Sequence, residues 1–262
     1  MMSLLAGKCG LIFGVANDRS YAFHIARSLV EHGARCAFTS LPGEKNERRT
    51  RRAVEKIGVG SPWVRPCDAG RDEDLDAVFE AYTAEHERLD FLIHSIAFAD
   101  RQWLAPGRFT DTPRSAYLSA IDISAYTLAA MAQRARAPMT ATGGGSVLSM
   151  SYYGAEKVVP GYNVMGVAKA ALECTTRYLA AELGERNIRV NAISGGPLRT
   201  LASSAVGGID VMLERTPERA PLRRNVEGAD VGGAAVFLVS DLASGVTGET
   251  IYVDCGVNTI GA

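Results

Sequence analysis

The sequence predicts a single α/β domain, a doubly wound parallel sheet of about seven strands with helices on both faces. Three observations lead to this prediction. Short β-like runs alternate along the chain with longer stretches of helical spacing. The length of 262 residues suits one large domain of this class. No Pro/Ser-rich linker, internal repeat or low-complexity tract divides the chain, so residues 1–262 are expected to form one unit.

The expected strands are short apolar runs bounded by turn residues, as in strands that are buried on both faces. They cover residues 9–13, 36–39, 63–65, 91–95, 147–150, 190–193 and 251–253. The first helix shows apolar spacing from Ala22 to Val30, and Gly33 occupies the position of a C-terminal cap. The other expected helices cover residues 115–136, 163–183 and 227–240, and the mixed charges of residues 45–56 indicate a solvated helix face.

Composition excludes several classes of protein. The formal net charge of −1 offers no field that would attract nucleic acid or an anionic membrane surface. No apolar stretch is long and uncharged enough to span a bilayer, so a soluble protein is expected. The five cysteines are scattered and form no C-x-x-C pair, which is typical of reduced thiols in the cytoplasm. The four histidines show no metal-ligand spacing, so no metal is expected.

The ends of the predicted strands carry the features of a dinucleotide groove. Residues 14–20 join the first strand to the first helix, where a Rossmann-type fold places a pyrophosphate on a helix N-terminus. The motif G-x-G-x-x-G is absent, and an ordinary loop with Ser20 as helix N-cap is the alternative. Asp68 follows the third strand, where it could accept a hydrogen bond from an adenine amino group. Small residues follow the fourth and sixth strands, at Ser95 and at Gly195, and together these positions describe one groove.

A mobile loop is expected at about residues 195–216, because residues 195–208 are rich in Gly, Ser and Ala. This segment follows the carboxyl end of the sixth strand. In open α/β sheets ligands bind at that edge, so a lid over a substrate is predicted there.

A tyrosine and a lysine come after the fifth strand, where they indicate the short-chain dehydrogenase/reductase superfamily. The usual superfamily spacing is Tyr-x3-Lys, but here Met165 holds the tyrosine position and cannot donate a proton. The spacing is instead Tyr162-x6-Lys169, which on a continuous helix is nearly two turns and would place both side chains on one face, about 10 Å apart along the axis. The position of the superfamily's catalytic serine falls on Tyr152.

Both departures resemble one divergent branch of that superfamily, the bacterial enoyl-[acyl-carrier-protein] reductases. The segments that carry the resemblance are residues 151–166 (SYYGAEKVVPGYNVMG), 189–202 (RVNAISGGPLRTLA), 94–99 (HSIAFA) and 122–124 (DIS). Matches run from about Gly7 to Val257, which is nearly the whole chain. The long Tyr-x6-Lys segment is the specific motif among them.

The resemblance implies a reaction and a set of site residues. The chain is expected to reduce the trans-2 double bond of an enoyl thioester on acyl carrier protein, in fatty acid biosynthesis, as a homotetramer. Tyr162 should hydrogen-bond the thioester carbonyl with help from Tyr152, and Ala99 should lie against the acyl chain. For Tyr153, packing is the preferred interpretation. The residues implied to bind the dinucleotide are Gly14, Ser20, Tyr21, Leu41, Asp68, Ala69, Ile96, Lys169, Leu198, Thr200 and Ala202.

The identity of the dinucleotide depends on the end of the second strand. An acidic residue there indicates NAD and a basic residue indicates NADP, but Leu41 is neither. The resemblance favours NADH. NADPH is the alternative, because Lys45, Arg48 and Arg49 follow closely enough to reach a 2′-phosphate. Three other functions are the alternatives. A ketoacyl or other carbonyl reductase would need a tyrosine where Met165 stands. The others are a sensor that binds a dinucleotide without chemistry, and a nucleic-acid binder.

Overall fold

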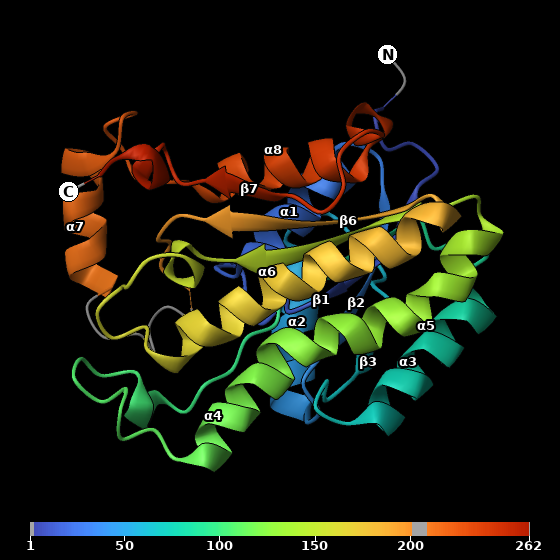
Figure 1. Ribbon diagram of the computed structural model, residues 1–262. Coiled ribbons are helices and arrows are strands. Elements are labelled where there is room, and N and C mark those ends of the chain that lie inside the picture. Colours follow the sequence, from blue (N-terminus) through green and yellow to red (C-terminus); the bar gives the residue numbers. More distant parts are fainter. Residues whose placement is uncertain (1–2, 201–208, 262) are drawn as a thin grey trace.

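Seven parallel strands form one sheet in the computed structural model, which describes residues 3–200 and 209–261. The strands are β1 (Cys9–Phe13), β2 (Arg35–Ser40), β3 (Val64–Pro66), β4 (Phe91–His94), β5 (Gly145–Ser151), β6 (Ile188–Gly195) and β7 (Thr250–Val253). Their order in the sheet is β3-β2-β1-β4-β5-β6-β7 (Figure 1). The chain therefore runs outward in one direction from β1 to β3 and in the other from β4 to β7, which creates a topological switch point between β1 and β4.

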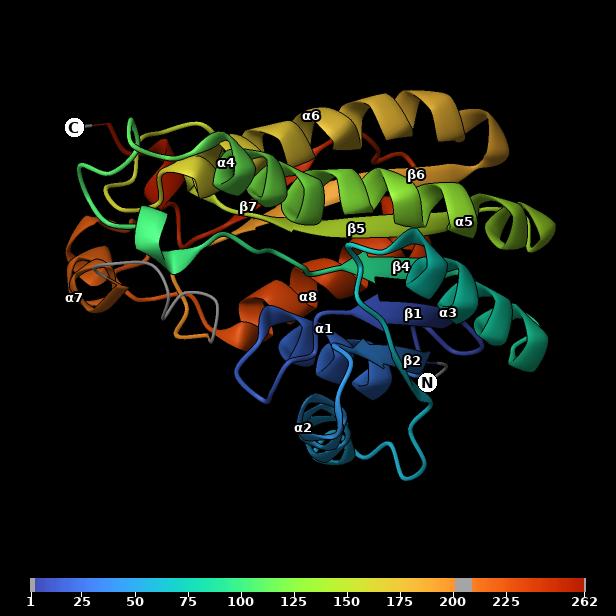
Figure 2. The same ribbon diagram turned by 90° about the horizontal axis from the view of Figure 1, so that it is seen from below.

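Helices cover both faces of this sheet, as the view in Figure 2 shows. One face carries α1 (Tyr21–Glu31), α2 (Glu44–Glu55) and α8 (Gly228–Val239). The other face carries α3 (Asp72–Glu85), α5 (Thr127–Ala141) and α6 (Val164–Leu183). Two further helices lie beside the carboxyl ends of the strands, α4 (Arg114–Ile121) and α7 (Ile209–Arg219). The predicted doubly wound α/β fold is confirmed.

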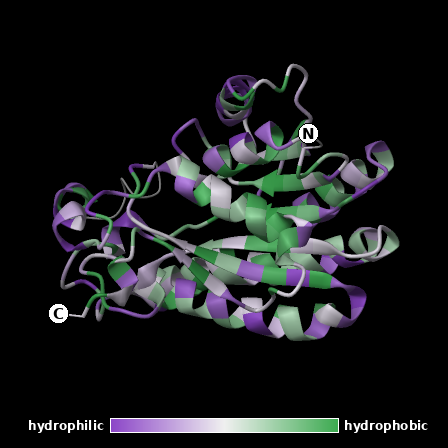
Figure 3. Cartoon of the chain, turned by 90° about the horizontal axis from the view of Figure 1, so that it is seen from above, coloured by the Kyte–Doolittle hydropathy of each residue, from purple (hydrophilic) through white to green (hydrophobic). Residues whose placement is uncertain are grey.

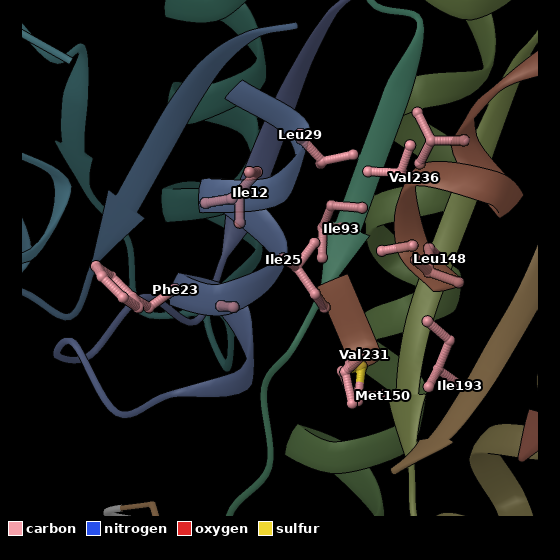
Figure 4. Close-up of a cluster of buried hydrophobic side chains, with 14 of the residues drawn as sticks. Ile12, Phe23, Ile25, Leu29, Ile93, Leu148, Met150, Ile193, Val231 and Val236 are labelled. Carbon is pink, nitrogen blue, oxygen red and sulfur yellow. The ribbon is translucent and has the colours of Figure 1, made fainter. Parts of the chain in front are cut away.

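Alternation of side chains along the strands divides the core into two layers. Ile12 of β1 packs with α1 and α8, whereas its neighbours Leu11 and Phe13 pack with α3 and α5. The first layer is drawn in Figure 4, where Ile25 and Val231 approach each other from α1 and α8. Figure 3 shows the same division by hydropathy, with apolar strands inside and polar outer faces on the helices. Burial on both faces explains why the strands are continuous apolar runs.

The predicted strands agree with the structure to within a few residues at each end. Ser20 caps α1, as in the alternative interpretation of this loop, since its hydroxyl accepts a hydrogen bond from the Phe23 amide at 3.3 Å. The helix predicted at residues 115–136 is longer, running from Arg114 to Ala141 through a π-helical turn, Asp122–Tyr126. No helix within the described ranges has the length and apolar character needed to cross a membrane.

The loop predicted at about residues 195–216 is too long at its end, because α7 begins at Ile209. The Gly, Ser and Ala-rich composition that predicted the loop stops at Gly208. Pro217 extends the appearance of a loop in the sequence, but it lies near the C-terminal end of α7. Residues 201–208 lie outside the described part of the chain.

Candidate active site

The switch point places two chain segments in close contact. Gly14 follows β1 with φ +103°, and Ser95 follows β4. A β-carbon at Gly14 would lie 2.1 Å from the Ser95 carbonyl oxygen, so only glycine fits. The close approach leaves a shallow edge at the carboxyl ends of the two central strands, where dinucleotides bind in this topology.

The start of α1 forms the phosphate side of this groove. Ser20 uses its hydroxyl to cap the helix, and the helix begins at Tyr21 with no acidic residue in its first turn. An anion would therefore meet the positive end of the helix dipole without repulsion. The Tyr21 hydroxyl donates a hydrogen bond to the Gly196 carbonyl, which ties the phosphate side of the groove to the end of β6. Gly14, Ser20 and Tyr21 are thus brought together as predicted, and these residues fit a bound dinucleotide.

Four of the residues predicted to bind the dinucleotide lie along the same strand edge. Asp68 is half-buried after β3, and its carboxylate accepts a hydrogen bond from the Gly70 amide at 3.0 Å. Ala69 beside it is buried, whereas the Leu41 side chain after β2 is 62% exposed. Ile96, after β4, packs against the core on the α3 side. This hydrogen bond orients the Asp68 carboxylate at the strand edge where the sequence predicts an adenine contact.

Two tyrosines lie face to edge beyond β5. The rings of Tyr152 and Tyr162 have centroids 4.9 Å apart and planes inclined by 70°. Both belong to a small apolar cluster that also contains Ala99, Leu104 and Met165. The structure thus brings together Tyr152, Tyr162 and Ala99, the three residues predicted to meet the substrate. No hydrogen bond from another described residue occupies the Tyr162 hydroxyl.

Burial sets the protonation of these phenols. It raises the pKa of Tyr152 to about 12, with the nearby Asp254 carboxylate acting in the same direction. Burial also raises the pKa of Tyr162 above its usual range, reinforced by Tyr152. Both hydroxyls therefore carry their protons at neutral pH and are able to donate hydrogen bonds.

One geometric prediction was wrong. Tyr162 does not lie on the same helix as Lys169, because α6 begins only at Val164. The chain turns sharply before the helix, through Gly161 with φ +81° and Asn163 with φ +44°. Tyr162 and Lys169 are therefore not two turns apart on one helix face, and their side chains reach the site from different elements.

Lys169 is buried on α6, with 5% of its surface exposed. Its ammonium donates a hydrogen bond of 2.7 Å to the Met150 carbonyl at the end of β5. One turn later, Glu173 accepts a hydrogen bond from Ser151, the last residue of β5. Burial lowers the pKa of Lys169 to about 8, while the Glu173 carboxylate acts in the opposite direction. Helix α6 thus holds the strand end that leads into Tyr152.

His94 has a structural role at the end of β4. It is fully buried at the end of β4, and its Nε2 lies 2.8 Å from the Thr127 hydroxyl. Burial, together with the nearby Lys169, lowers its pKa to about 3. The imidazole is therefore neutral at physiological pH and is not a source of protons there.

The segment after β6 contains three of the residues predicted to bind the dinucleotide. Leu198 is half-buried and Thr200 is buried at this position, whereas Ala202 lies outside the described residues. Arg199 forms an ion pair with Asp210 at 2.5 Å, which links the segment to α7. Helix α7 in turn covers Tyr152, since the Met212 sulfur lies 3.7 Å from the tyrosine hydroxyl.

Three polar side chains that the sequence analysis did not single out also hold the site together. Glu173 has a detectable signal, its four-residue spacing from Lys169 on a helix. Ser124 binds the loop after β4, since its hydroxyl accepts from the Phe98 amide at 2.9 Å and donates to the Phe98 carbonyl. Asn163 binds the same loop further along, through the Trp103 and Ala105 carbonyls. Partners this distant in sequence leave no local pattern.

Comparisons with known proteins point to one family of reductases. Residues 14–258 match the family model described as "Enoyl-(Acyl carrier protein) reductase". The enoyl-[acyl-carrier-protein] reductase [NADH] FabI of Synechocystis sp. is 48% identical over 259 residues, covering 98% of each chain. The enzyme of the same name from Bacillus cereus is 48% identical over 260 residues, covering 99% of this chain and 100% of its own.

Two solved structures are similar over the whole chain. The Anaplasma phagocytophilum reductase in complex with NAD has a TM-score of 0.93 and 46% identity, and the match covers 100% of this chain and 98% of that one. The Bacillus cereus reductase with NADP⁺ and an indole naphthyridinone has a TM-score of 0.95 and 48% identity, and the match covers 100% of both chains. A nicotinamide dinucleotide with or without a 2′-phosphate is therefore found in proteins of this shape.

Proposed function

Because the chain belongs to the enoyl-(acyl carrier protein) reductase family, we propose that Tyr162 is the hydrogen-bond donor with which it reduces enoyl thioesters. The chain is an NADH-dependent oxidoreductase of fatty acid biosynthesis. The observation that supports the role of Tyr162 is its position: it lies beside Tyr152 and Ala99 in one apolar cluster, while Met165 replaces the donor of related carbonyl reductases.

When bound, the reduced nicotinamide would supply a hydride to the β-carbon of the trans-2-enoyl thioester. Negative charge then develops on the thioester oxygen, and the Tyr162 hydroxyl donates a hydrogen bond to that oxygen. Since the bond is stronger to the developing enolate than to the neutral carbonyl, it accelerates the reaction. Tyr152 packs edge-on against Tyr162 and keeps the ring in place, and its hydroxyl would act as a second donor by giving up its 3.7 Å contact with the Met212 sulfur. The surrounding apolar cluster excludes water from the reacting carbonyl.

Lys169 is proposed to hold the ribose hydroxyls of the dinucleotide. Its ammonium is already fixed by the Met150 carbonyl at 2.7 Å, so two of its three protons remain for a ligand. A buried positive charge also favours the cofactor phosphates and the developing enolate. Of the remaining predicted contacts, Gly14, Ser20 and Tyr21 would face the pyrophosphate.

The reaction is tested with NADH that carries deuterium at the transferable position. The expected product is the saturated thioester with one deuterium at the β-carbon and a solvent proton at the α-carbon. Deuterium at the α-carbon, or its absence from the product, would reject the proposed direction of hydride transfer.

The pH dependence of cofactor use follows from Lys169. Its pKa of about 8 means that the ammonium is charged below that pH and neutral above it. We therefore expect kcat/KM for NADH, which reports the free enzyme, to fall as the pH rises through about 8. The two tyrosines do not contribute in this range, because burial raises the pKa of both. The check is a profile of kcat/KM against pH, and the descending limb should be missing from Lys169→Met.

NADPH is proposed as a second cofactor because of a basic cavity beside the phosphate turn. The cavity has a volume of about 300 Å³ and lies between α2 and the end of that turn. Its lining residues are Asn17, Asp18, Lys45, Arg48, Arg49, Arg52, Ala53 and Lys56. Helix α2 is joined to the turn by Thr50, whose hydroxyl donates to the Val15 carbonyl at 2.7 Å. Among the described residues Lys45, Arg48, Arg49 and Arg52 form no ion pair, so a 2′-phosphate would meet uncompensated charge.

We expect the double substitution Lys45→Ala/Arg49→Ala to raise KM for NADPH about 10-fold relative to KM for NADH, since each lost charged contact weakens phosphate binding. The measurement is the ratio of the two KM values. Arg51→Ala is the matched control, because Arg51 lies on the same helix but pairs with Glu47 at 2.9 Å and does not line the cavity. An unchanged ratio in the double variant, or a wild-type enzyme inactive with NADPH, would contradict the assignment.

We infer the substrate carrier, assembly and location from family membership and from surface features. The relatives' names give acyl carrier protein as the carrier of the enoyl group. A homotetramer is supported by large exposed apolar side chains on neighbouring helical segments, with Leu118, Tyr126 and Tyr178 each more than half exposed. All five cysteines are free thiols, which supports a cytoplasmic location.

A further inference from the structure

The backbone at Asn163 has a conformation that non-glycine residues rarely adopt. Its φ is +44° and its ψ is −124°, which lies outside the left-handed helical region. The other asparagine with a positive φ, Asn187, has φ +56° and ψ +30° and lies within that region, which asparagine adopts more readily than most residues. Strain of this kind persists only where the surroundings over-determine the conformation, and it concentrates at functional sites.

The Asn163 side chain is held by a distant loop. Its amide nitrogen donates to the Trp103 carbonyl at 2.7 Å and to the Ala105 carbonyl at 2.8 Å. Both partners are acceptors only, so they use both amide protons and fix the orientation of the side chain. Leu104, between the two carbonyls, is 3% exposed and packs in the same cluster as Tyr162. The asparagine thus joins the start of α6 to the loop between β4 and α4.

That loop carries the predicted acyl contact. Ala99 lies between two anchors: Ser124 holds the neighbouring Phe98 at both its amide and its carbonyl, and Asn163 holds the far side of the loop. A change at Asn163 would release one anchor and leave the other intact. The acyl side of the site therefore depends on the asparagine side chain.

The asparagine backbone determines where Tyr162 lies relative to α6. The carbonyls of Tyr162 and Asn163 accept the first hydrogen bonds of the helix, from Met165 at 3.0 Å and from Gly166 at 2.9 Å. The backbone dihedrals of Asn163 are the torsions between the tyrosine and the helix. A relaxed backbone there would swing the phenol away from Tyr152.

We propose that Asn163 is a positioning residue for Tyr162. Its strained backbone orients the tyrosine hydroxyl, and its two side-chain hydrogen bonds fix that orientation relative to the loop that carries Ala99. The proposal rests on the donor role of Tyr162 proposed above. Asn163 itself touches neither substrate nor cofactor in this account.

The first test uses Asn163→Gly, which accepts the backbone conformation but loses both hydrogen bonds, and Asn163→Asp, which keeps the shape but loses both donors. We expect kcat to fall on the order of 10- to 100-fold in each, because small displacements of a reacting group have effects of this size. The dissociation constant of NADH, measured by fluorescence titration, should change less than about 2-fold, since the phosphate side of the groove is untouched. Unchanged kcat in a folded variant of either kind would overturn the proposal.

Asn187→Gly is the matched control for loss of stability. Asn187 also has a positive φ and also donates to a distant carbonyl, that of Gly143 at 2.9 Å. It precedes β6 and therefore lies at the amino ends of the strands, whereas the tyrosines lie beyond the carboxyl ends. Its replacement should lower the melting temperature but leave kcat unchanged. An equal fall of kcat in Asn187→Gly would show that Asn163 acts only through stability and would reject the positioning role.

A double-mutant cycle with Tyr162→Phe separates positioning from general disruption. If Asn163 acts through the tyrosine hydroxyl, Asn163→Gly should cost less than about 2-fold in kcat once that hydroxyl is absent. Multiplicative losses would reject the proposal while leaving the role of Tyr162 intact. Wild-type turnover in Tyr162→Phe itself would reject both, so the two failures are distinguishable.

Discussion

Tyr162→Phe is expected to lower kcat on the order of 100- to 1000-fold, the usual effect of removing one donor to a developing oxyanion. The substitution keeps the ring that packs at 4.9 Å against Tyr152, so the apolar cluster should survive. Because the hydroxyl is proposed to face the acyl thioester rather than the pyrophosphate, NADH affinity should be unchanged. Steady-state kinetics and an NADH titration on the same preparation provide the measurement.

The neighbouring Tyr153 offers the control for this substitution. Its ring packs against Tyr252 with centroids 6.4 Å apart, away from Tyr162. Tyr153→Phe should retain kcat within about 2-fold, because it keeps the half-buried ring and removes no donor to the substrate. Full turnover in Tyr162→Phe, or an equal loss in Tyr153→Phe, would contradict the assignment of Tyr162 as donor.

Lys169→Met is expected to weaken NADH binding by about 10- to 100-fold, which corresponds to the loss of a charge-assisted hydrogen bond. Methionine fills the space of the lysine stem, so packing along α6 should be retained. The dissociation constant of NADH is the quantity to measure. Lys157→Met serves as the control, since Lys157 is exposed in the segment between Tyr152 and Tyr162.

The outcome that would contradict this account is unchanged NADH affinity in Lys169→Met with reduced kcat. That result would move Lys169 from holding the dinucleotide to stabilising the enolate alone. A loss of affinity in Lys157→Met of the same size would instead indicate a general effect of surface charge.

The architecture could be predicted from the sequence because its signals are local. Strands buried on both faces appear as continuous apolar runs, and β1 at Cys9–Phe13 was placed at its observed bounds. The α1 cap at Ser20 follows from residue type alone. Helix α7 was missed because Pro217 and the preceding Gly-rich segment have the composition of a loop.

The site was predicted only in part, for a different reason. Tyr152, Tyr162 and Lys169 were found through a spacing that resembles a known family, but the spacing did not show that a turn separates Tyr162 from α6. The strained φ of Asn163 depends on hydrogen bonds to Trp103 and Ala105, which lie far away along the chain. Contacts of this range arise from tertiary packing and have no sequence period.

The reaction that the chain catalyses is tested most simply by NADH oxidation with two thioesters of equal chain length. One is a trans-2-enoyl and the other a 3-ketoacyl thioester, each presented on acyl carrier protein. We expect rapid turnover of the enoyl thioester and none of the ketoacyl thioester, because Tyr162 and Tyr152 lie together at the site and Met165 holds the position of the carbonyl reductase donor. Turnover of the ketoacyl thioester alone would contradict it and would place the donor elsewhere in the site.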